Sequence, residues 1–203
     1  MEKPAPTEHH IHELLRRRWS PRAFAARSVE PEKLASLFEA ARWAPSSFNG
    51  QPWHYIVATK DDPAAFERLL NCLRPQNIQW AQHAPVLIIA VAELSLGDDR
   101  GPNRHAFHDV GLANENLVLQ AVALGLVSHQ MAGFFPDKAR ETFNIPEAYE
   151  ALTAIAVGYP GDPEDLPPEV KARELQPRER RPLSAFVFAD AWGREWAAPT
   201  GNE

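Results

Sequence analysis

The spacing of hydrophobic and polar residues predicts an α-helix in each of two segments of the chain. From Pro31, apolar residues follow one another at intervals of three and four, the spacing of one buried helix face, and Pro45 ends the pattern. A longer pattern runs from about Asn103 to Leu124, with apolar residues on more than one side. That distribution is typical of a buried helix. Gly125 follows it and predicts a C-terminal stop.

Three further segments have the character of β-strands. Trp53–Thr59 is rich in aromatic and β-branched residues, and a Lys-Asp-Asp-Pro break with a short helix follows it. Pro85–Ala92 is apolar throughout, as expected for a strand buried on both faces. Ala151–Gly158 alternates enough to form another strand. With 203 residues, these elements fit one domain.

The two ends of the chain differ from its middle. Residues 1–10 are polar, and we expect a flexible tail there. Residues 160–182 are rich in proline and charge, so we expect a connector that does not pack tightly by itself. Aromatic and apolar residues follow this connector, namely Phe186, Val187, Phe188, Trp192 and Trp196. We therefore expect an arm that docks elsewhere, for instance on a second subunit.

Composition removes several classes of protein. Apolar residues make up 44% and charged residues 24%, as in globular proteins, and the net charge of −6 argues against nucleic-acid binding. The single cysteine, Cys72, excludes an internal disulfide and cysteine-based metal sites, which favours the cytoplasm. Ala84–Ala92 is the most apolar stretch and is far shorter than the ~20 residues of a membrane span. Met1–His10 lacks the apolar region of a signal peptide.

Common catalytic and metal motifs are missing from the sequence. There is no GxGxxG fingerprint, no phosphate loop, no GxSxG nucleophile elbow and no HExxH. Two histidine clusters have ligand-type side chains, and for both we favour solvation or structural hydrogen bonds over a metal. They are His9, His10, His12 and Glu13 near the N-terminus and His105, His108 and Asp109 on the long helix.

Basic residues and a polar loop are the candidate binding features. Pro21 favours an extended segment, in which Arg18, Ser20 and Arg22 would share one face and suit a phosphate monoester. Arg178 and Arg180 repeat the spacing, although by themselves these basic residues favour a solvated stretch. A second feature joins the first helix to the first strand. The loop of residues 44–53 holds two prolines and several amide and hydroxyl side chains, which suit the edge of a planar heterocycle or a capped turn.

These two features together resemble the nitroreductase family of FMN-dependent oxidoreductases. The motifs are Arg18-x-Ser20-x-Arg22-x-Phe24 and Ala44-Pro45-Ser46-Ser47-x-Asn49-x-Gln51-Pro52-Trp53. Weaker matches follow in order, and the resemblance covers roughly residues 11–196. They are Ala84-Pro85, Asp109-x-Gly111, Gly125-Leu126, Gly133-Phe134, Ile145-Pro146, Gly158-Tyr159-Pro160 and Arg180-Arg181-Pro182-Leu183.

The resemblance implies an α+β fold in which helices surround a mixed central β-sheet. It also implies an intertwined homodimer in which the C-terminal arm, about residues 160–203 of a single domain over 11–203, packs on the partner subunit. Two FMN molecules would lie at the dimer interface. The residues expected to bind FMN are Arg18, Trp19, Ser20, Arg22, Pro45, Ser46, Ser47, Asn49, Asn77, Ala132, Gly133, Arg178 and Arg180.

Within that set, the resemblance assigns distinct parts of the cofactor. Arg18, Ser20 and Arg180, with Arg178 as a further candidate, would hold the phosphate. Residues 45–49 would line the ring and the ribityl chain. Arg22 and Asn77 would face the pyrimidine edge, and the backbone of residues 132–133 would approach N5. Trp80 stands where some members carry a lysine near N1, which affects the flavin potential unless Arg22 supplies the charge.

The expected activity follows from this resemblance. NADH or NADPH would reduce the flavin, and a nitroaromatic, quinone or similar small aromatic acceptor would reoxidise it by a ping-pong scheme through N5. No side chain is assigned as a catalytic acid or base, and no metal is expected. The alternatives are a specialised flavoenzyme of the family (a dehalogenase, an enal reductase or an azoline oxidase) and a non-catalytic FMN-binding protein.

Overall fold

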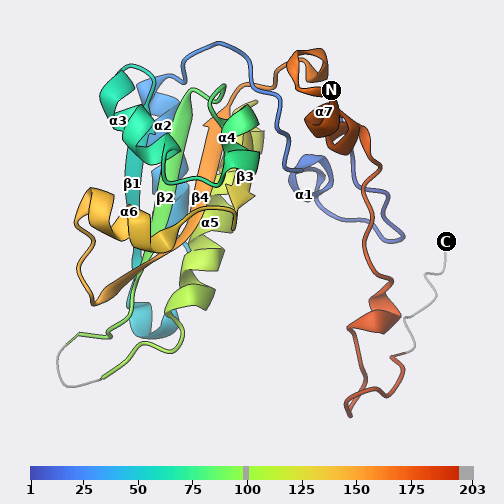
Figure 1. Ribbon diagram of the computed structural model, residues 1–203. Helices are drawn as coiled ribbons and strands as arrows, with labels where there is room; N and C mark the ends of the chain where they lie inside the picture. Colours follow the sequence, from blue (N-terminus) through green and yellow to red (C-terminus); the bar gives the residue numbers. More distant parts are fainter. Residues whose placement is uncertain (98–100, 197–203) are drawn as a thin grey trace.

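The strands form one antiparallel sheet in a computed structural model that describes residues 1–97 and 101–196. Their order across the sheet is β1 (Trp53–Thr59), β2 (Val86–Glu93), β4 (Tyr149–Gly158) and β3 (Val127–Met131) (Figure 1). The α+β class is confirmed, but the expected mixed pairing is wrong for these four strands. β2 and β3 run parallel to each other, but they do not pair because β4 lies between them, antiparallel to both.

Helices cover both faces of the sheet (Figure 1). One face carries α2 (Pro31–Arg42) and α5 (Ala106–Ala123), and the other carries α3 (Pro63–Leu70), α4 (Pro75–Ala81) and α6 (Pro136–Phe143). Side chains of β2 alternate between the two resulting cores, with Leu87 and Ile89 in one and Ile88 in the other. The expectation that this strand is buried on both faces is therefore confirmed.

Proline residues mark the starts of many of these helices. In the described residues, five helices have proline at their first position, where the missing N–H would lack a partner in any case. These residues are Pro31, Pro63, Pro75, Pro136 and Pro168. The high proline count of the chain thus reflects helix starts as well as loops.

The strongly patterned elements lie where the sequence predicts them. The helix from Pro31, the strand Trp53–Thr59 and the long helix are all present, the last as α5. The strand expected at residues 85–92 is β2, and the one expected at 151–158 is β4, two residues longer at its start. β3 was not predicted, because its sequence Val-Ser-His-Gln-Met has too few apolar residues to reveal a strand.

Part of the expected connector is packed. Residues 160–182 contain a short 3-10 helix at Pro163–Asp165 and α7 (Pro168–Leu175). Leu166 and Val170 belong to the core on the face of the sheet that carries α3, α4 and α6, and the side chain of Glu174 is buried. The expectation of a loosely packed connector is therefore wrong for residues 163–175. A few apolar anchors and one buried carboxylate suffice to hold a charged helix against the body.

The arm was expected over about residues 160–203, but its first part is packed as described above. The name C-terminal arm is therefore kept for residues 176–196, the described residues after α7, which are extended and lead away from the sheet in Figure 1. It contains a short 3-10 helix at Leu183–Ala185, and its aromatic side chains are open to solvent. Phe186 is 60% exposed and Trp192 is 93% exposed. The rest of the expected arm, residues 197–203, lies outside the described residues.

The N-terminal segment runs beside the C-terminal arm. The Ala5 amide donates to the Arg16 carbonyl at 2.8 Å, next to the short helix α1 (Glu13–Arg17). The Arg178 guanidinium donates to the carbonyls of Lys3 and Arg16 at 2.7 and 3.0 Å. Within the described residues, none of the helices is long and apolar enough to cross a membrane, and no cluster of three or more metal-binding side chains occurs.

Candidate functional site

Two cavities contain most of the candidate residues. The first, called the β3 cavity, has a volume of about 320 Å³ and lies between the end of β3, the start of α4, and α7. It is lined by Arg22, Arg74, Gln76, Asn77, His129, Gln130, Met131, Ala132, Gly133 and Arg173. Four residues that the sequence assigned to one end of a flavin therefore come together here from three separate parts of the chain.

Contacts between α4 and the segment after β3 shape one wall of the β3 cavity. The carbonyl of Gly133 accepts from Nδ2 of Asn77 at 2.9 Å and from the backbone N–H of Arg74 at 3.0 Å. A Cβ on Gly133 would lie 2.5 Å from Nδ2 of Asn77, so a side chain at this position would have to displace the Asn77 amide. The remaining Asn77 groups, Oδ1 and one N–H, stay available to a ligand edge.

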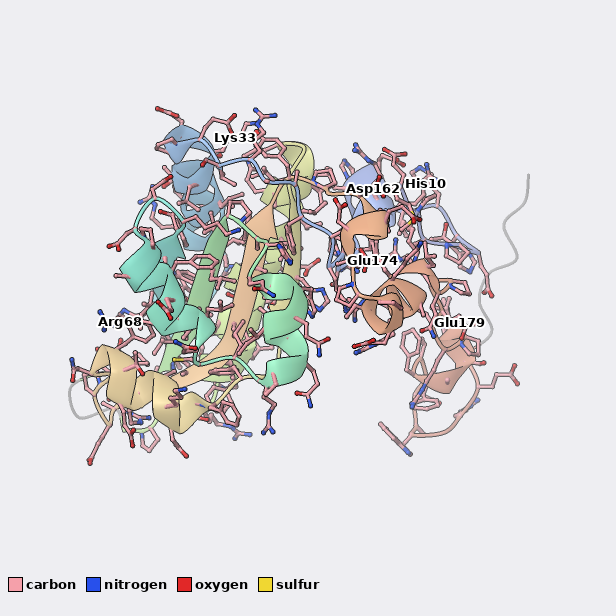
Figure 2. The ribbon with its side chains drawn as sticks, turned by 45° about the horizontal axis from the view of Figure 1, so that its top comes forward. His10, Lys33, Arg68, Asp162, Glu174 and Glu179 are labelled. Atoms are coloured by element: carbon pink, nitrogen blue, oxygen red, sulfur yellow. The ribbon has the colours of Figure 1, made fainter. Side chains whose placement is uncertain are left out.

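A buried carboxylate holds Arg22 in this cavity. Glu174 on α7, labelled in Figure 2, has a side chain that is 1% exposed. Its carboxylate accepts from the backbone N–H of Arg22 at 2.9 and 3.1 Å and from that of Ala23 at 3.3 Å. It also pairs with the Arg22 guanidinium at 3.5 Å. Burial, and then the charge of Arg173, lower the pKa of Arg22, which Glu174 opposes.

His129 adds a polar but uncharged group to the β3 cavity. Its Nδ1 donates to the carbonyl of Pro21 at 3.0 Å, since a carbonyl oxygen can only accept. Burial lowers the pKa of this imidazole to about 4, so His129 is neutral near pH 7. The ring lies 4.5 Å from that of Trp80. Trp80 is 1% exposed and also stacks on Phe24, so it belongs to the core and does not line the cavity.

The second cavity, called the arm cavity, lies between the N-terminal segment and the C-terminal arm and has a volume of about 760 Å³. It contains four guanidinium groups, from Arg18, Arg178, Arg180 and Arg181, and two acidic residues, Glu8 and Glu179. Burial, and then the charges of Arg18 and Arg180, lower the pKa of Arg178.

Little carboxylate charge offsets these arginines. Among the described residues, the nearest carboxylate to any of them is Glu115 on α5, 4.0 Å from Nε of Arg18, and no ion pair within that distance involves Arg178 or Arg180. Like charges brought this close in a partly buried site favour an anion. Dianionic phosphate suits such a set of guanidinium groups.

The structure separates two residues that the sequence placed on one face. Arg18 lines the arm cavity, whereas Arg22 lines the β3 cavity. The hydrogen bond from the Arg22 backbone to Glu174 fixes the Arg22 segment beside α7. Trp19 and Ser20 lie between them and line neither cavity. The Trp19 ring instead faces Nζ of Lys3 at 4.8 Å.

The polar loop of residues 44–53 has a bent backbone fixed by side chains. Phe48, Asn49 and Gln51 all have left-handed φ angles of 53°, 54° and 48°. The backbone N–H of Ser47 donates to Oδ2 of Asp109 at 2.9 Å, and that of Gln51 donates to Oγ of Ser46 at 3.1 Å. Asp109 also accepts from Nδ1 of His108 at 3.0 Å when that nitrogen is protonated, so this histidine cluster is used in structural hydrogen bonding.

This loop lies at the sheet edge opposite the β3 cavity. Pro45, Ser46, Ser47 and Asn49 precede β1, whereas the β3 cavity adjoins β3, and these strands are the two edges of the four-stranded sheet. β1 and β3 are three strand spacings apart, about 14 Å, and neither cavity is lined by a residue of the loop. Within one chain, therefore, the structure does not bring the loop to the residues of either cavity.

Sequence reasoning missed several residues of the β3 cavity region, among them His129, Arg74, Arg173 and Glu174. Pro168 followed by Glu169 is a helix-start signal that could have revealed α7 and with it the latter two residues. Nothing in the sequence indicates that Glu174 packs against a backbone 152 residues away. Arg74 carries no sequence signal beyond its position before Pro75.

Comparisons with known proteins find similar sequences and similar folds. The nitroreductase family model matches residues 15–159. A crystal structure described as an oxidoreductase containing FMN is 32% identical with a TM-score of 0.88, covering 93% of this chain and 96% of that one. A nitroreductase family protein from Clostridium difficile 630 is 27% identical with a TM-score of 0.69, covering 88% and 96%. A protein from Archaeoglobus fulgidus, provisionally named NADH dehydrogenase/NAD(P)H nitroreductase, is 29% identical over 73% of this chain and 84% of its own.

Proposed function

The chain belongs to the nitroreductase family, and from this premise we propose that it is an FMN-dependent oxidoreductase that uses NADH or NADPH as its electron donor. The observation that carries the proposal is the β3 cavity. It joins Arg22, Asn77 and the backbone of residues 132–133, which the family resemblance assigns to the flavin ring. The FMN-containing structural relative and the names of other relatives support the same activity.

The chemistry of the residues fits FMN. In the β3 cavity, guanidinium and amide groups offer donors and acceptors for the edge of a planar heterocycle. In the arm cavity, we assign Arg18, Arg178 and Arg180 to the phosphate, together with Ser20 and Trp19 on the segment between the cavities. When bound, FMN would supply a ring that accepts a hydride at N5 and passes it to an acceptor.

We assign the completion of the site to a second copy of the chain. Pro45, Ser46, Ser47 and Asn49 line neither cavity of their own chain, so they would line the ring and ribityl chain bound by a partner. The exposed aromatic residues of the C-terminal arm support such a homodimer, because isolated arms rarely expose so much apolar surface without a partner. The exchange of arms between two subunits is part of this proposal.

The dimer is tested by light scattering after size exclusion. Phe186→Ser with Trp192→Ser removes two exposed aromatic side chains and should shift the protein toward monomer with loss of bound flavin. Trp43→Ser is the matched control, because Trp43 is 74% exposed but lies outside the arm. An arm variant that stays fully dimeric with its flavin would contradict arm exchange.

No side chain of the β3 cavity is assigned as a catalytic acid or base. His129 is the titratable imidazole there; with a pKa of about 4 it is neutral near pH 7, and its Nδ1–H is held by the Pro21 carbonyl, so it is not an imidazolium acid. Solvent would supply the proton, and the residues of the cavity would bind and orient donor and acceptor in turn. The acceptors proposed are nitroaromatics, quinones or related small aromatic compounds.

The single buried thiol supports a reducing, cytoplasmic setting.

The first experiment is the visible absorption spectrum of the purified protein before and after NADH or NADPH is added without oxygen. Flavin bands that bleach are the expected result. Steady oxidation of NAD(P)H with a nitroaromatic, and parallel double-reciprocal plots, should follow. Persistent bands with both donors would point to a specialised flavoenzyme with another reductant. A protein that takes up no FMN on reconstitution would refute the proposal.

A further inference from the structure

The β3 cavity contains more positive charge than its own carboxylate offsets. Three guanidinium groups line it, from Arg22, Arg74 and Arg173. Glu174 pairs with Arg22, and its oxygens also accept the backbone N–H groups of two residues. Among the described residues, no ion pair within 4.0 Å involves Arg74 or Arg173. Two cations without an ion-pair partner among the described residues therefore line the cavity.

Both of these arginines line the cavity and remain open to solvent. The backbone of Arg74 is tied to the Gly133 carbonyl, and its Cζ lies 5.0 Å from the centroid of the Phe135 ring. That contact limits the rotamers of the Arg74 side chain. The charge of Arg173 lowers the pKa of both Arg22 and His129, which line the same cavity.

A flavin ring alone does not account for this charge. The ring of oxidised FMN is neutral, and one cation near N1 is enough to stabilise its anionic reduced form. Arg22, held by Glu174, is in position to supply that cation. The phosphate has its own arginines in the arm cavity. Arg74 and Arg173 are thus left for another anionic group.

We propose that Arg74 and Arg173 bind a carboxylate on the electron acceptor, so that the enzyme prefers acidic aromatic acceptors over neutral ones. This inference rests on the proposed function. Guanidinium groups bind planar carboxylates through paired hydrogen bonds, which fixes orientation as well as position. With 4-nitrobenzoate, NADH loses a hydride to become NAD⁺, and the nitro group gains that hydride and one solvent proton. The products are 4-nitrosobenzoate and water.

The test compares 4-nitrobenzoate with neutral 4-nitrobenzyl alcohol. We expect kcat/KM to favour the anion about tenfold or more in the wild-type protein at low salt. Arg74→Gln and Arg173→Gln should each lower kcat/KM for the anion about tenfold and change that for the alcohol less than twofold. Arg42→Gln is the matched control, because Arg42 is an exposed arginine on α2, on the opposite face of the sheet.

Calorimetric titration with 4-nitrobenzoate gives a second readout that needs no turnover. Binding should weaken about tenfold in each variant and remain unchanged in the control. Because this signal, measured on the protein as purified, does not require electron transfer, it distinguishes failure of the inference from failure of the proposed function, which the absorption spectrum tests. Equal rates for both acceptors in the wild type would overturn the inference. So would variants that lose affinity for NADH but keep it for 4-nitrobenzoate, since the arginines would then bind the donor's phosphates.

Discussion

Removing the carboxylate of Glu174 should destabilise the protein far more than its position on a charged helix suggests. The side chain is 1% exposed and accepts from two backbone N–H groups, at 2.9 and 3.1 Å from Arg22 and at 3.3 Å from Ala23. Glu174→Ala leaves both donors and one guanidinium without their partner. Breaking a buried ion pair by removing one member costs about 3–5 kcal/mol, so we expect the free energy of unfolding to fall by about 4 kcal/mol.

Two further variants make this reasoning specific. Glu174→Gln keeps one acceptor oxygen but loses the charge, and its cost should be about 1–2 kcal/mol. Glu169→Ala is the matched control on the same helix, because Glu169 is exposed and surface changes usually stay within about 0.5 kcal/mol. For a chain of this size, 1 kcal/mol corresponds to about 2–4 °C in Tm. Glu174→Ala should therefore melt about 8–16 °C below the wild type.

The assay is urea unfolding of flavin-free protein, followed by circular dichroism at one protein concentration and one pH. A fixed concentration matters because dimerisation would add to apparent stability. The order expected for the loss is Glu174→Ala, then Glu174→Gln, then Glu169→Ala. If Glu174→Ala and Glu169→Ala unfold within 1 kcal/mol of each other, the carboxylate does not hold the Arg22 backbone as described.

Three other predictions concern phosphate binding, packing and pH. Arg18→Ala with Arg180→Ala should purify without flavin absorbance, and full retention of flavin would contradict the phosphate assignment. Gly133→Ala places a Cβ 2.5 Å from Nδ2 of Asn77 on α4. It should lower the free energy of unfolding in urea by about 1–3 kcal/mol and weaken FMN binding at least tenfold. Gly111→Ala is the control and should do neither, because a Cβ there has no neighbour within 4 Å. Burial lowers the pKa of His129 to about 4, so the unfolded state takes up this proton first and stability falls as pH drops below 6.5. His129→Asn should remove about 2 kcal/mol of the loss in unfolding free energy between pH 7.5 and 5, and an unchanged pH profile would refute this.

The fold was predictable where a buried face leaves a regular pattern in the sequence. β2 is buried along nearly its whole length, and α5 is apolar on several sides, so both show their environment directly. β3 does not, because an edge strand needs few apolar residues, and two of its five side chains are polar ones that line the cavity. α7 was hidden for a similar reason: Val170 and Glu174 are its buried residues, and one of them is charged.

The candidate site was predictable as a set of residues but not as an arrangement. Motif resemblance picked out Arg22 and Asn77, which line one cavity, and Arg18, which lines another. Arg22 is held at the β3 cavity, away from Arg18, by the hydrogen bond from its backbone N–H to Glu174, 152 residues further along the chain. No local period or spacing encodes such a contact. For the same reason, Arg74 and Arg173 entered the site only through the folded structure.

The geometry of the polar loop bears on how the site would be completed. A bulky residue such as Phe48 rarely adopts a left-handed backbone, and each such residue costs on the order of 1–3 kcal/mol. The loop offsets this cost internally, through Asp109 on α5 and the hydroxyl of Ser46. Its shape is therefore set before any ligand arrives, while Phe48 itself stays 80% exposed. A preformed loop with an exposed aromatic residue suits the shared site proposed above. Because its backbone is already ordered, it would contact the partner's cavity without a further loss of conformational entropy.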